Sequence, residues 1–361
     1  MKIPKAMLET QNRSNPLSRS KLIGRCIVSC IFVFLTHLAL SVIPRFFSAF
    51  SFLTQLALSA LLLLLLLGFG GWCRRTLLRA KASAPAFVFF NILFIWGFYF
   101  SVIRPAVPQL HDVVFNCGVV FLFIGLYSII TSDPGIVTNG SASPDQPMES
   151  SLSQVDKEME LLASGLGHES THDSGLLMRV RYCKTCKAYI KGLDHHCPAF
   201  GNCIGQNNHP LFLILLFGFI STEASYLVCS SVFAAKSRIL DRPSELTLSE
   251  SLAVSTILFT ILQLLWQVVF LIWHIYCLCV NIRTDEWIKW KKYPEFQLVI
   301  PPEPGQSFRN IRFWNPYDKE SLNSRHCSIH EESSLPLSYI FHLLYIFQHL
   351  EQHDKPLGGM D

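Results

Sequence analysis

The stretch Leu193-Asp194-His195-His196-Cys197 brings a carboxylate, two imidazoles and a thiol together in a chain that is otherwise mostly apolar. Cys183 and Cys186 precede it, and Cys203 follows it. A Cys-x2-Cys pair followed by a His and a further Cys is the ligand set of a tetrahedral zinc site. One of the two adjacent histidines would complete that site, and the spacing does not choose between them. The remaining carboxylate, imidazole and thiol are the parts of an activated cysteine nucleophile.

The rest of the chain has the composition of a membrane protein. Of its 361 residues, 50% are hydrophobic and only 16% are charged, and the mean hydropathy is +0.34. Soluble domains carry roughly 25% charged residues. The formal net charge is +4, and the basic residues cluster beside the apolar stretches, which indicates membrane topology and not nucleic-acid binding.

Six stretches are long and apolar enough to cross a bilayer as helices, which takes about 20 residues. We therefore predict an all-α integral membrane protein with about six transmembrane helices and a cytosolic, zinc-stabilised cysteine-rich loop between spans four and five. The expected spans are Leu22–Ile43, Phe50–Trp72, Ala86–Ile103, Val113–Thr131, Leu211–Ala235 and Leu252–Val280.

The charge bias places the cysteine-rich loop in the cytosol. Basic residues before span one, between spans two and three, and after span six all fall on the same side of the membrane as this loop. The positive-inside rule makes that side cytoplasmic, where thiols stay reduced. Both termini are then cytosolic, and the membrane is expected to be an endomembrane (Golgi or ER) or the plasma membrane.

The motif resembles the core of the DHHC family of protein S-acyltransferases. The resemblance rests on Asp194-His195-His196-Cys197-Pro198, then Asn202-Cys203-Ile204-Gly205, and Asn207. Three weaker marks flank it: Asp133-Pro134-Gly135, similar to the family's DPG motif; Thr284-Asp285-Glu286, similar to the end of its TTxE motif; and Asn315-Pro316-Tyr317-Asp318-Lys319. The resemblance implies an integral membrane enzyme that moves fatty acyl groups from acyl-CoA to protein cysteines.

The resemblance also implies a role for each residue of the motif. Cys197 would be the nucleophile and carry an S-palmitoyl intermediate, His195 the general base, and Asp194 the group that orients His195. The zinc ligands would be Cys183, Cys186, His196 and Cys203. The co-substrate would be palmitoyl-CoA or another acyl-CoA, reacting by a ping-pong mechanism, and the partners would be membrane lipid and cytosolic-face proteins with accessible cysteines, with no nucleic acid.

On this basis the chain divides into six regions. Residues 1–21 form a cytosolic N-terminal segment, 22–131 contain spans one to four, and 132–178 hold the DPG motif and a linker with a short helix at Val155–Ala163. Residues 179–210 form the zinc domain and 211–280 contain spans five and six. Residues 281–361 form a cytosolic C-terminal region, with an interfacial helix at Leu335–Leu350. Asp133 and Thr284 are expected to anchor the zinc loop to the bundle.

Two departures from the family pattern concern the site. Members generally carry a second zinc site, but Glu169, His172, Tyr182 and Tyr189 occupy its ligand positions here, so one zinc is expected. His168 and His172 have the spacing for a substitute site, which we regard as the weaker interpretation. Ala199 stands where the family has a tryptophan after Cys-Pro, which bears on rate or acyl-chain preference.

Alternative functions remain open. A catalytically weak or inactive family member acting as a membrane scaffold or adaptor would explain the lost second zinc site, whereas the intact nucleophile motif argues against it. A transporter has thin support, since Glu223 is the single charged residue deep inside an expected span. On the last span, Gln263, Gln267 and His274 share one face with Asn281, which indicates interhelical hydrogen bonds more than a lining for the acyl or CoA groove.

Overall fold

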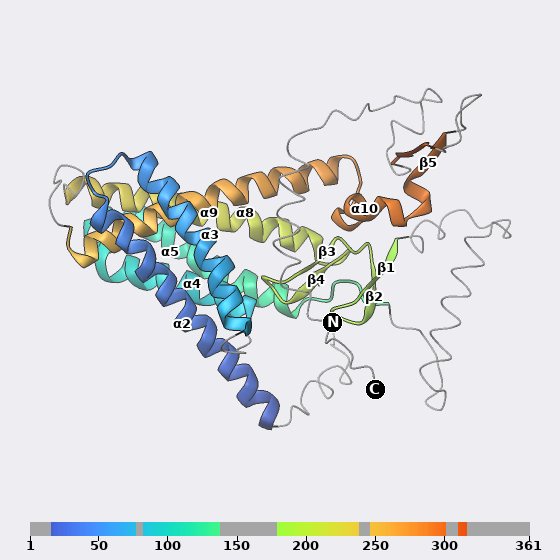
Figure 1. Ribbon diagram of the computed structural model, residues 1–361, viewed down its shortest axis with the longest axis horizontal. Coiled ribbons are helices and arrows are strands. Elements are labelled where there is room, and N and C mark those ends of the chain that lie inside the picture. The colour runs from blue at the N-terminus through green and yellow to red at the C-terminus, as the bar shows by residue number, and fades with distance from the viewer. Residues whose placement is uncertain (1–15, 77–81, 138–178, 238–245, 301–309, 316–361) are drawn as a thin grey trace. The chain divides into compact units, whose positions relative to one another are not determined.

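The computed structural model describes residues 16–76, 82–137, 179–237, 246–300 and 310–315 (Figure 1). The expected helices at Val155–Ala163 and Leu335–Leu350 lie outside these residues, as do His168, Glu169, His172 and the Pro316–Lys319 mark. The chain divides into two compact units, Met1–Tyr276 and Cys277–Asp361, and each is described by itself.

The first unit is built mainly from long helices. These are α2 (Pro16–Phe46), α3 (Phe52–Thr76), α4 (Ala84–Phe98), α5 (Gln109–Thr131), α8 (His209–Lys236) and α9 (Leu248–Cys279, whose last residues belong to the second unit). Short helical turns η1 (Tyr99–Ile103) and η2 (Arg104–Ala106) extend α4. Many leucine, isoleucine and phenylalanine side chains on these helices are exposed, as expected of surfaces that face lipid.

Five of the six expected spans are long and apolar enough to cross a membrane: Ser20–Phe46, Ala84–Ala106, Gln109–Thr131, His209–Lys236 and Leu248–Cys279. The remaining expected span, the second along the chain, forms helix α3. Its apolar part within the described residues, Phe52–Gly68, is shorter than the other five. The expectation of a multi-pass helical membrane protein is therefore confirmed, with five membrane-capable helices. The first helix continues beyond the expected end of its span at Ile43, to Phe46, with Pro44 inside its last turn.

The helix α2 is fastened to α4 by two polar contacts. At the start of α4, Ser29 Oγ donates to the Ser83 carbonyl and accepts from the Ser83 amide, both at 2.9 Å. Farther along, His37 Nε2 lies 2.9 Å from Asn91 Oδ1. In a membrane, lipid is as apolar as the side chains, so hydrophobic burial does little to favour one helix arrangement over another. Hydrogen bonds between helices therefore help to specify which helices pack together.

Close packing of α5 against α8 depends on glycine. A Cβ on Gly125 would lie 2.6 Å from a methyl carbon of Leu215, and a Cβ on Gly218 would lie 2.2 Å from the Phe121 ring. Small residues allow helix backbones to approach in this way in membrane bundles. The cysteine-rich region leads directly into α8, so this packing fixes the C-terminal end of that region.

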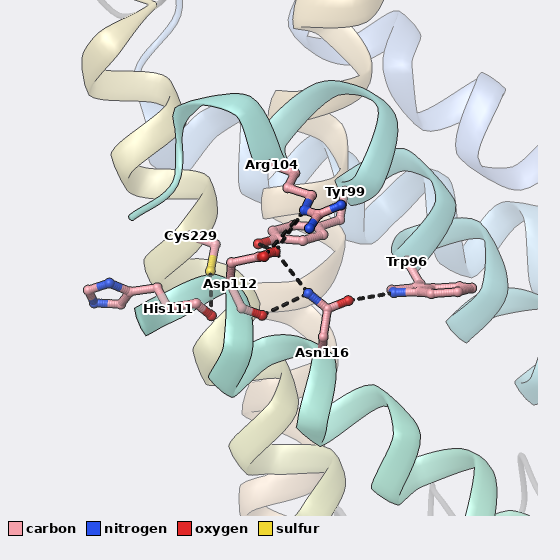
Figure 2. A network of polar contacts seen from close by, with 7 residues as sticks. All are labelled: Trp96, Tyr99, Arg104, His111, Asp112, Asn116 and Cys229. Atoms are coloured by element: carbon pink, nitrogen blue, oxygen red, sulfur yellow. Dashed lines mark hydrogen bonds and ion pairs between the residues drawn. The ribbon is translucent and has the colours of Figure 1, made fainter. Parts of the chain in front are cut away.

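A polar network lies at the start of α5 (Figure 2). Asp112, in the first turn of α5, accepts hydrogen bonds from Tyr99 Oη at 2.9 Å and Asn116 Nδ2 at 2.8 Å, and lies 3.2 Å from Arg104 Nε. Asn116 in turn accepts from Trp96 Nε1 at 3.0 Å. The network joins α4, η1 and η2 to α5.

The cysteine-rich region folds as two short hairpins (Figure 1). Strand β1 (Val180–Cys183) pairs antiparallel with β2 (Ala188–Lys191), and β3 (His195–Cys197) pairs antiparallel with β4 (Asn202–Ile204). The sequence predicted a loop here and not these strands. The second unit contains α10 (Thr284–Lys289), the turns η4 (Trp290–Lys292) and η5 (Pro294–Phe296), and a hairpin of β5 (Gln297–Ile300) with β6 (Asn310–Phe313).

Two of the flanking family marks stabilise this second unit locally. Glu286 is buried and its Oε2 accepts from the Arg283 amide at 2.9 Å, which closes the first turn of α10. Asn315 Nδ2 donates to the Val280 carbonyl at 2.7 Å. Thr284 begins α10, within the same unit, so its expected role as an anchor for the zinc loop stays a prediction.

Candidate active site and metal centre

The two hairpins bring the four expected metal ligands together. Cys183 ends β1, Cys186 lies in the β1–β2 turn, and His196 and Cys203 are directly opposite each other on β3 and β4. One ligand atom from each lies within 4.8 Å of all the others. Cys186 Sγ is 3.4 Å from both Cys203 Sγ and His196 Nδ1, and Cys203 Sγ is 3.5 Å from His196 Nδ1. Around a tetrahedral zinc such separations would be about 3.5–3.8 Å, given bonds of ~2.3 Å to sulfur and ~2.0 Å to nitrogen.

The chemistry of the donor set also suits a cation. The hydrogen bonds that Cys183 accepts from Cys203 and His196 hold the pKa of the Cys183 thiol well below its usual range. The pKa of Cys203 is raised, first by its bond to the Cys183 thiolate and then by burial, and burial raises that of Cys186. Ionising one thiol therefore opposes ionising the others, and a divalent cation is the group that would stabilise all three as thiolates. These four residues fit a metal.

Strand geometry separates the two histidines. Successive side chains on a β-strand point to opposite faces, so His195 and Cys197 share one face of β3 and His196 points to the other. The register pairs His196 with Cys203, on the metal-cluster side. The sequence alone could not choose between the two histidines. The alternation places His196 among the thiols and His195 beside Cys197.

On the other face, Asp194, His195 and Cys197 form the candidate catalytic group. His195 Nδ1 donates to Asp194 Oδ2 at 2.7 Å, and the Asp194 side chain is almost fully buried. His195 Nε2 has no hydrogen-bond partner among the described residues. Burial alone would lower the pKa of His195, but the bond to Asp194 and the nearby Cys197 sulfur outweigh it and raise that pKa to about 10. This imidazole is therefore a strong base for the thiol.

Cys197 belongs to the core of the helical bundle. Its side chain is buried, and it shares a hydrophobic cluster with Phe200 and Ile204 of its own hairpin and with Phe212 and Leu215 of α8. The thiol thus lies where the polar hairpin meets the apolar spans. A shallow apolar groove of about 470 Å³ runs between α4 and α5, lined by Pro85, Phe89, Leu93, Phe123, Leu126, Tyr127 and Ile130.

Two asparagines fasten the second hairpin to the end of α5. Asn202 Nδ2 donates to the carbonyls of Ile129 and Ser132, both at 2.9 Å. Asn208, buried at the start of α8, accepts from the Gly205 amide at 2.9 Å and donates to the Cys203 carbonyl at 2.9 Å and to Ser132 Oγ at 3.0 Å. The sequence motif includes Asn202 and Asn207, of which Asn207 is exposed, and it does not identify Asn208.

The Asp133-Pro134-Gly135 segment fastens the first hairpin. Asp133 Oδ1 accepts from the amides of Gly135 and Ile136, so this carboxylate shapes a turn and does not itself reach the hairpin. The backbone after it does: the Gly135 carbonyl accepts from the Lys191 amide, and the Val137 amide donates to Tyr189, both at 2.9 Å. The expected anchoring therefore passes through the backbone that Asp133 orders.

Two further histidines, from α8 and α9, surround Asp194 and were not assigned to the site from the sequence. His209 Nε2 lies 4.0 Å from Asp194 Oδ1, and His274 Nδ1 lies 3.8 Å from Asp194 Oδ2. His274 stood out in the sequence only as one polar position on an apolar span. Its neighbour on that face, Gln267, donates to Glu223 Oε1 of α8 at 2.7 Å, which confirms the expected interhelical hydrogen bond.

Comparisons with known proteins agree with this geometry. A family model described as DHHC palmitoyltransferase matches residues 168–291, which include both hairpins, α8 and α9. Over these residues the chain is similar to the DHHC palmitoyltransferase family.

Similar curated proteins carry names of the same kind. "Probable protein S-acyltransferase 3" of Arabidopsis thaliana is 26% identical over 230 residues, which is 56% of this chain and 53% of that protein. "Palmitoyltransferase ERF2" of Eremothecium gossypii is 31% identical over 127 residues, 35% of this chain and 33% of that protein. "Palmitoyltransferase ZDHHC9" of Danio rerio is 24% identical over 252 residues, 63% and 58%. The chain spans about half the length of the curated relatives it matches.

The departures of this chain from the DHHC pattern have structural counterparts. Tyr182 and Tyr189, which stand at two ligand positions of the second zinc site, are direct cross-strand partners with ring centroids 5.1 Å apart. Such an aromatic pair stabilises a hairpin through packing. Ala199 is partly buried against the bundle core, while the next residue, Phe200, is buried and contacts Phe212 at 6.2 Å between centroids.

Proposed function

We propose that this chain is a protein S-acyltransferase that transfers a fatty acyl group, palmitoyl in the first instance, from acyl-CoA to cysteines of protein substrates through an S-acyl Cys197 intermediate. The observation that carries the proposal is the placement of Cys197. The thiol lies in the apolar core of the bundle, and His195 beside it is held by Asp194 at 2.7 Å.

The chemistry follows from that placement. His195 takes the Cys197 proton, and the sulfur attacks the acyl-CoA carbonyl carbon. A new carbon–sulfur bond forms, the bond to the CoA sulfur breaks, and His195 returns its proton to the departing CoA thiolate. In the second half, His195 deprotonates a substrate cysteine, whose sulfur attacks the acyl-enzyme and releases Cys197, which regains the proton. Each half exchanges one thioester for another, so no further energy source is required.

The metal would be a single Zn²⁺ held by Cys183, Cys186, His196 and Cys203. With four protein ligands it would be a structural ion, which supplies folding free energy to a region of little apolar content. Its role would be structural and not that of a Lewis acid toward a substrate, because His196, which would hold it, lies on the face of β3 opposite to Cys197.

The bundle would hold the acyl chain beside the thiol. The apolar cluster that includes Cys197 and the groove between α4 and α5 support this, since a fatty chain needs apolar surface on the membrane side of a nucleophile. The proposal places the hairpins at the cytosolic face of an endomembrane or the plasma membrane, where proteins with accessible cysteines would be the acceptors.

Autoacylation tests the proposal. Purified full-length protein in detergent is incubated with a labelled palmitoyl-CoA analogue, wild type beside Cys197→Ser, with zinc content measured on both. A label that hydroxylamine removes, found on wild type and not on Cys197→Ser, is the expected result. Zinc-loaded wild type that takes up no label would overturn the proposal and favour the scaffold or adaptor alternative, for which Ala199 and the Tyr182–Tyr189 pair would then be the first residues to test.

A further inference from the structure

The side chain of His274 is buried, and no described residue forms a hydrogen bond with it. It lies in α9 with 1% exposure, and its ring packs edge-on against Phe212 at 5.0 Å and Phe270 at 4.5 Å between centroids. Neither ring nitrogen has a hydrogen-bond partner among the described residues. A buried donor without an acceptor is costly, so its presence calls for a physical reason.

The polar group that faces it is the candidate catalytic carboxylate. His274 Nδ1 lies 3.8 Å from Asp194 Oδ2, the same oxygen that accepts from His195 at 2.7 Å. The other oxygen, Asp194 Oδ1, lies 4.0 Å from His209 Nε2. Asp194 thus lies among three imidazoles, with His195 hydrogen-bonded to Oδ2 and His274 about 1 Å beyond hydrogen-bonding distance of the same oxygen. Moving His274 by roughly 1 Å would bring Nδ1 into hydrogen-bonding range.

We propose that His274 is a positioning residue for Asp194. Its Nδ1–H closes on Asp194 Oδ2 when the site is engaged, since catalytic hydrogen bonds are often long in the free enzyme and tighten with substrate. A carboxylate oxygen accepts two donors, and a second one keeps Asp194 aligned with His195 as positive charge develops on that ring. The inference rests on the proposed acyl transfer through Cys197. It makes the last span, and not only the cysteine-rich region, a determinant of how reactive Cys197 is.

Three substitutions of His274 separate the effect of its hydrogen-bond donor from the effect of its side-chain size. His274→Phe keeps the ring size and loses the donor, His274→Asn keeps an N–H near the place of Nδ1, and His274→Gln places an N–H near that of Nε2. Two rates are measured on each full-length, zinc-loaded variant: single-turnover acylation over a range of palmitoyl-CoA concentrations, and alkylation of Cys197 by iodoacetamide at fixed pH, followed on the Cys197 peptide by mass spectrometry.

We expect His274→Phe to slow both rates about tenfold, which is the effect of losing one charge-assisted hydrogen bond. The palmitoyl-CoA concentration that gives half the maximal acylation rate should change less than about twofold. His274→Asn should recover most of the lost rate, and His274→Gln should not. His37→Phe is the matched control. It removes another buried imidazole, at 1% exposure in α2, and should leave the alkylation of Cys197 unchanged.

The outcomes separate this inference from the proposed function. If His274→Phe reacts like wild type, or if His274→Asn is as slow as His274→Phe and His274→Gln, then no donor at Nδ1 positions Asp194 and the inference is wrong. If wild type accepts no acyl group, the acyltransferase proposal fails. The alkylation rates then still decide whether His274 controls the Cys197 thiol, because that reaction needs no acyl-CoA.

Discussion

Replacing Asn208 by alanine should release the second hairpin from the bundle and weaken zinc binding. The amide of Asn208 is buried, with 1% exposure, and satisfies the Gly205 N–H and the Cys203 carbonyl. Its third partner, Ser132 Oγ, keeps a second bond to the Ile129 carbonyl. The substitution therefore strands two buried backbone groups, at about 1–3 kcal/mol each, or roughly 2–6 kcal/mol together.

This free energy should appear in the metal affinity. Cys203, whose carbonyl loses its hydrogen-bond donor, also supplies a thiol to the metal cluster. Where metal binding is coupled to folding of the segment that holds the ligands, any loss in the folding free energy of that segment lowers the metal affinity. Since 1.36 kcal/mol corresponds to tenfold, a loss of 2 kcal/mol weakens zinc binding by about 30-fold, and larger losses weaken it further. Competition against chelators of graded affinity, with zinc measured on the protein in detergent, gives this ratio.

The neighbouring asparagine is the matched control. Asn207 is exposed, and Asn207→Ala should keep zinc affinity within about twofold of wild type. The reasoning would be refuted if the two alanine variants lost zinc equally, or if Asn208→Ala bound zinc within threefold of wild type.

Three further predictions concern the metal cluster, the hairpin packing and the bundle. Cys203→Ser should lose zinc and thermal stability, whereas Cys197→Ser should keep zinc and lose acylation, as measured by metal analysis and autoacylation. Gly205→Ala should destabilise the hairpin by about 1–3 kcal/mol, because a Cβ there would lie 2.3 Å from a backbone carbonyl oxygen, whereas Gly24→Ala meets nothing within 4 Å and should be neutral in a thermal-shift assay. Gln267→Leu removes an interhelical hydrogen bond to a glutamate of α8 and should cost on the order of 1 kcal/mol, seen as a lower midpoint in thermal unfolding.

Specific results would contradict each of these. Zinc retained by Cys203→Ser would exclude that thiol from the ligand set. Equal midpoints for Gly205→Ala and Gly24→Ala would mean that the hairpin does not pack closely on its neighbour. Gln263, on the same face of α9, makes no hydrogen bond with any described residue, so a midpoint for Gln267→Leu no lower than that for Gln263→Leu would show that the pair with Glu223 does not stabilise the bundle.

Long apolar stretches and cysteine spacing were sufficient to predict much of this architecture. Hydropathy alone located the five membrane-capable helices, because a span is a property of about 20 consecutive residues. The spacing of Cys183, Cys186 and Cys203 identified the metal cluster, because ligands that are close in sequence must fold back only a short way. It did not predict the hairpins, since strands of three and four residues leave too little pattern to recognise.

What the sequence could not give were contacts between distant segments. Asn208 and its exposed neighbour Asn207 are the same residue type at adjacent positions, and only the three-dimensional path of α8 decides which is buried. Likewise, 80 positions separate Asp194 from His274 in the sequence, and no local pattern connects them. The residues that support a site from other helices are therefore the ones that the motif does not identify.

Successive side chains of β3 point to opposite faces of the strand, and this alternation couples the metal centre to the nucleophile. His196 points to the thiols of the metal cluster, while His195 and Cys197 on either side of it point to the bundle. Any movement of His196 must therefore move both of its neighbours, because a turn of the strand re-aims all three side chains together. A zinc ion that touches no reactant would still set the distance between His195 and Cys197, so chelation should slow the alkylation of Cys197 as well as unfold the hairpins, and a thiol whose reactivity is unchanged after zinc removal would argue that β3 keeps its geometry without the metal.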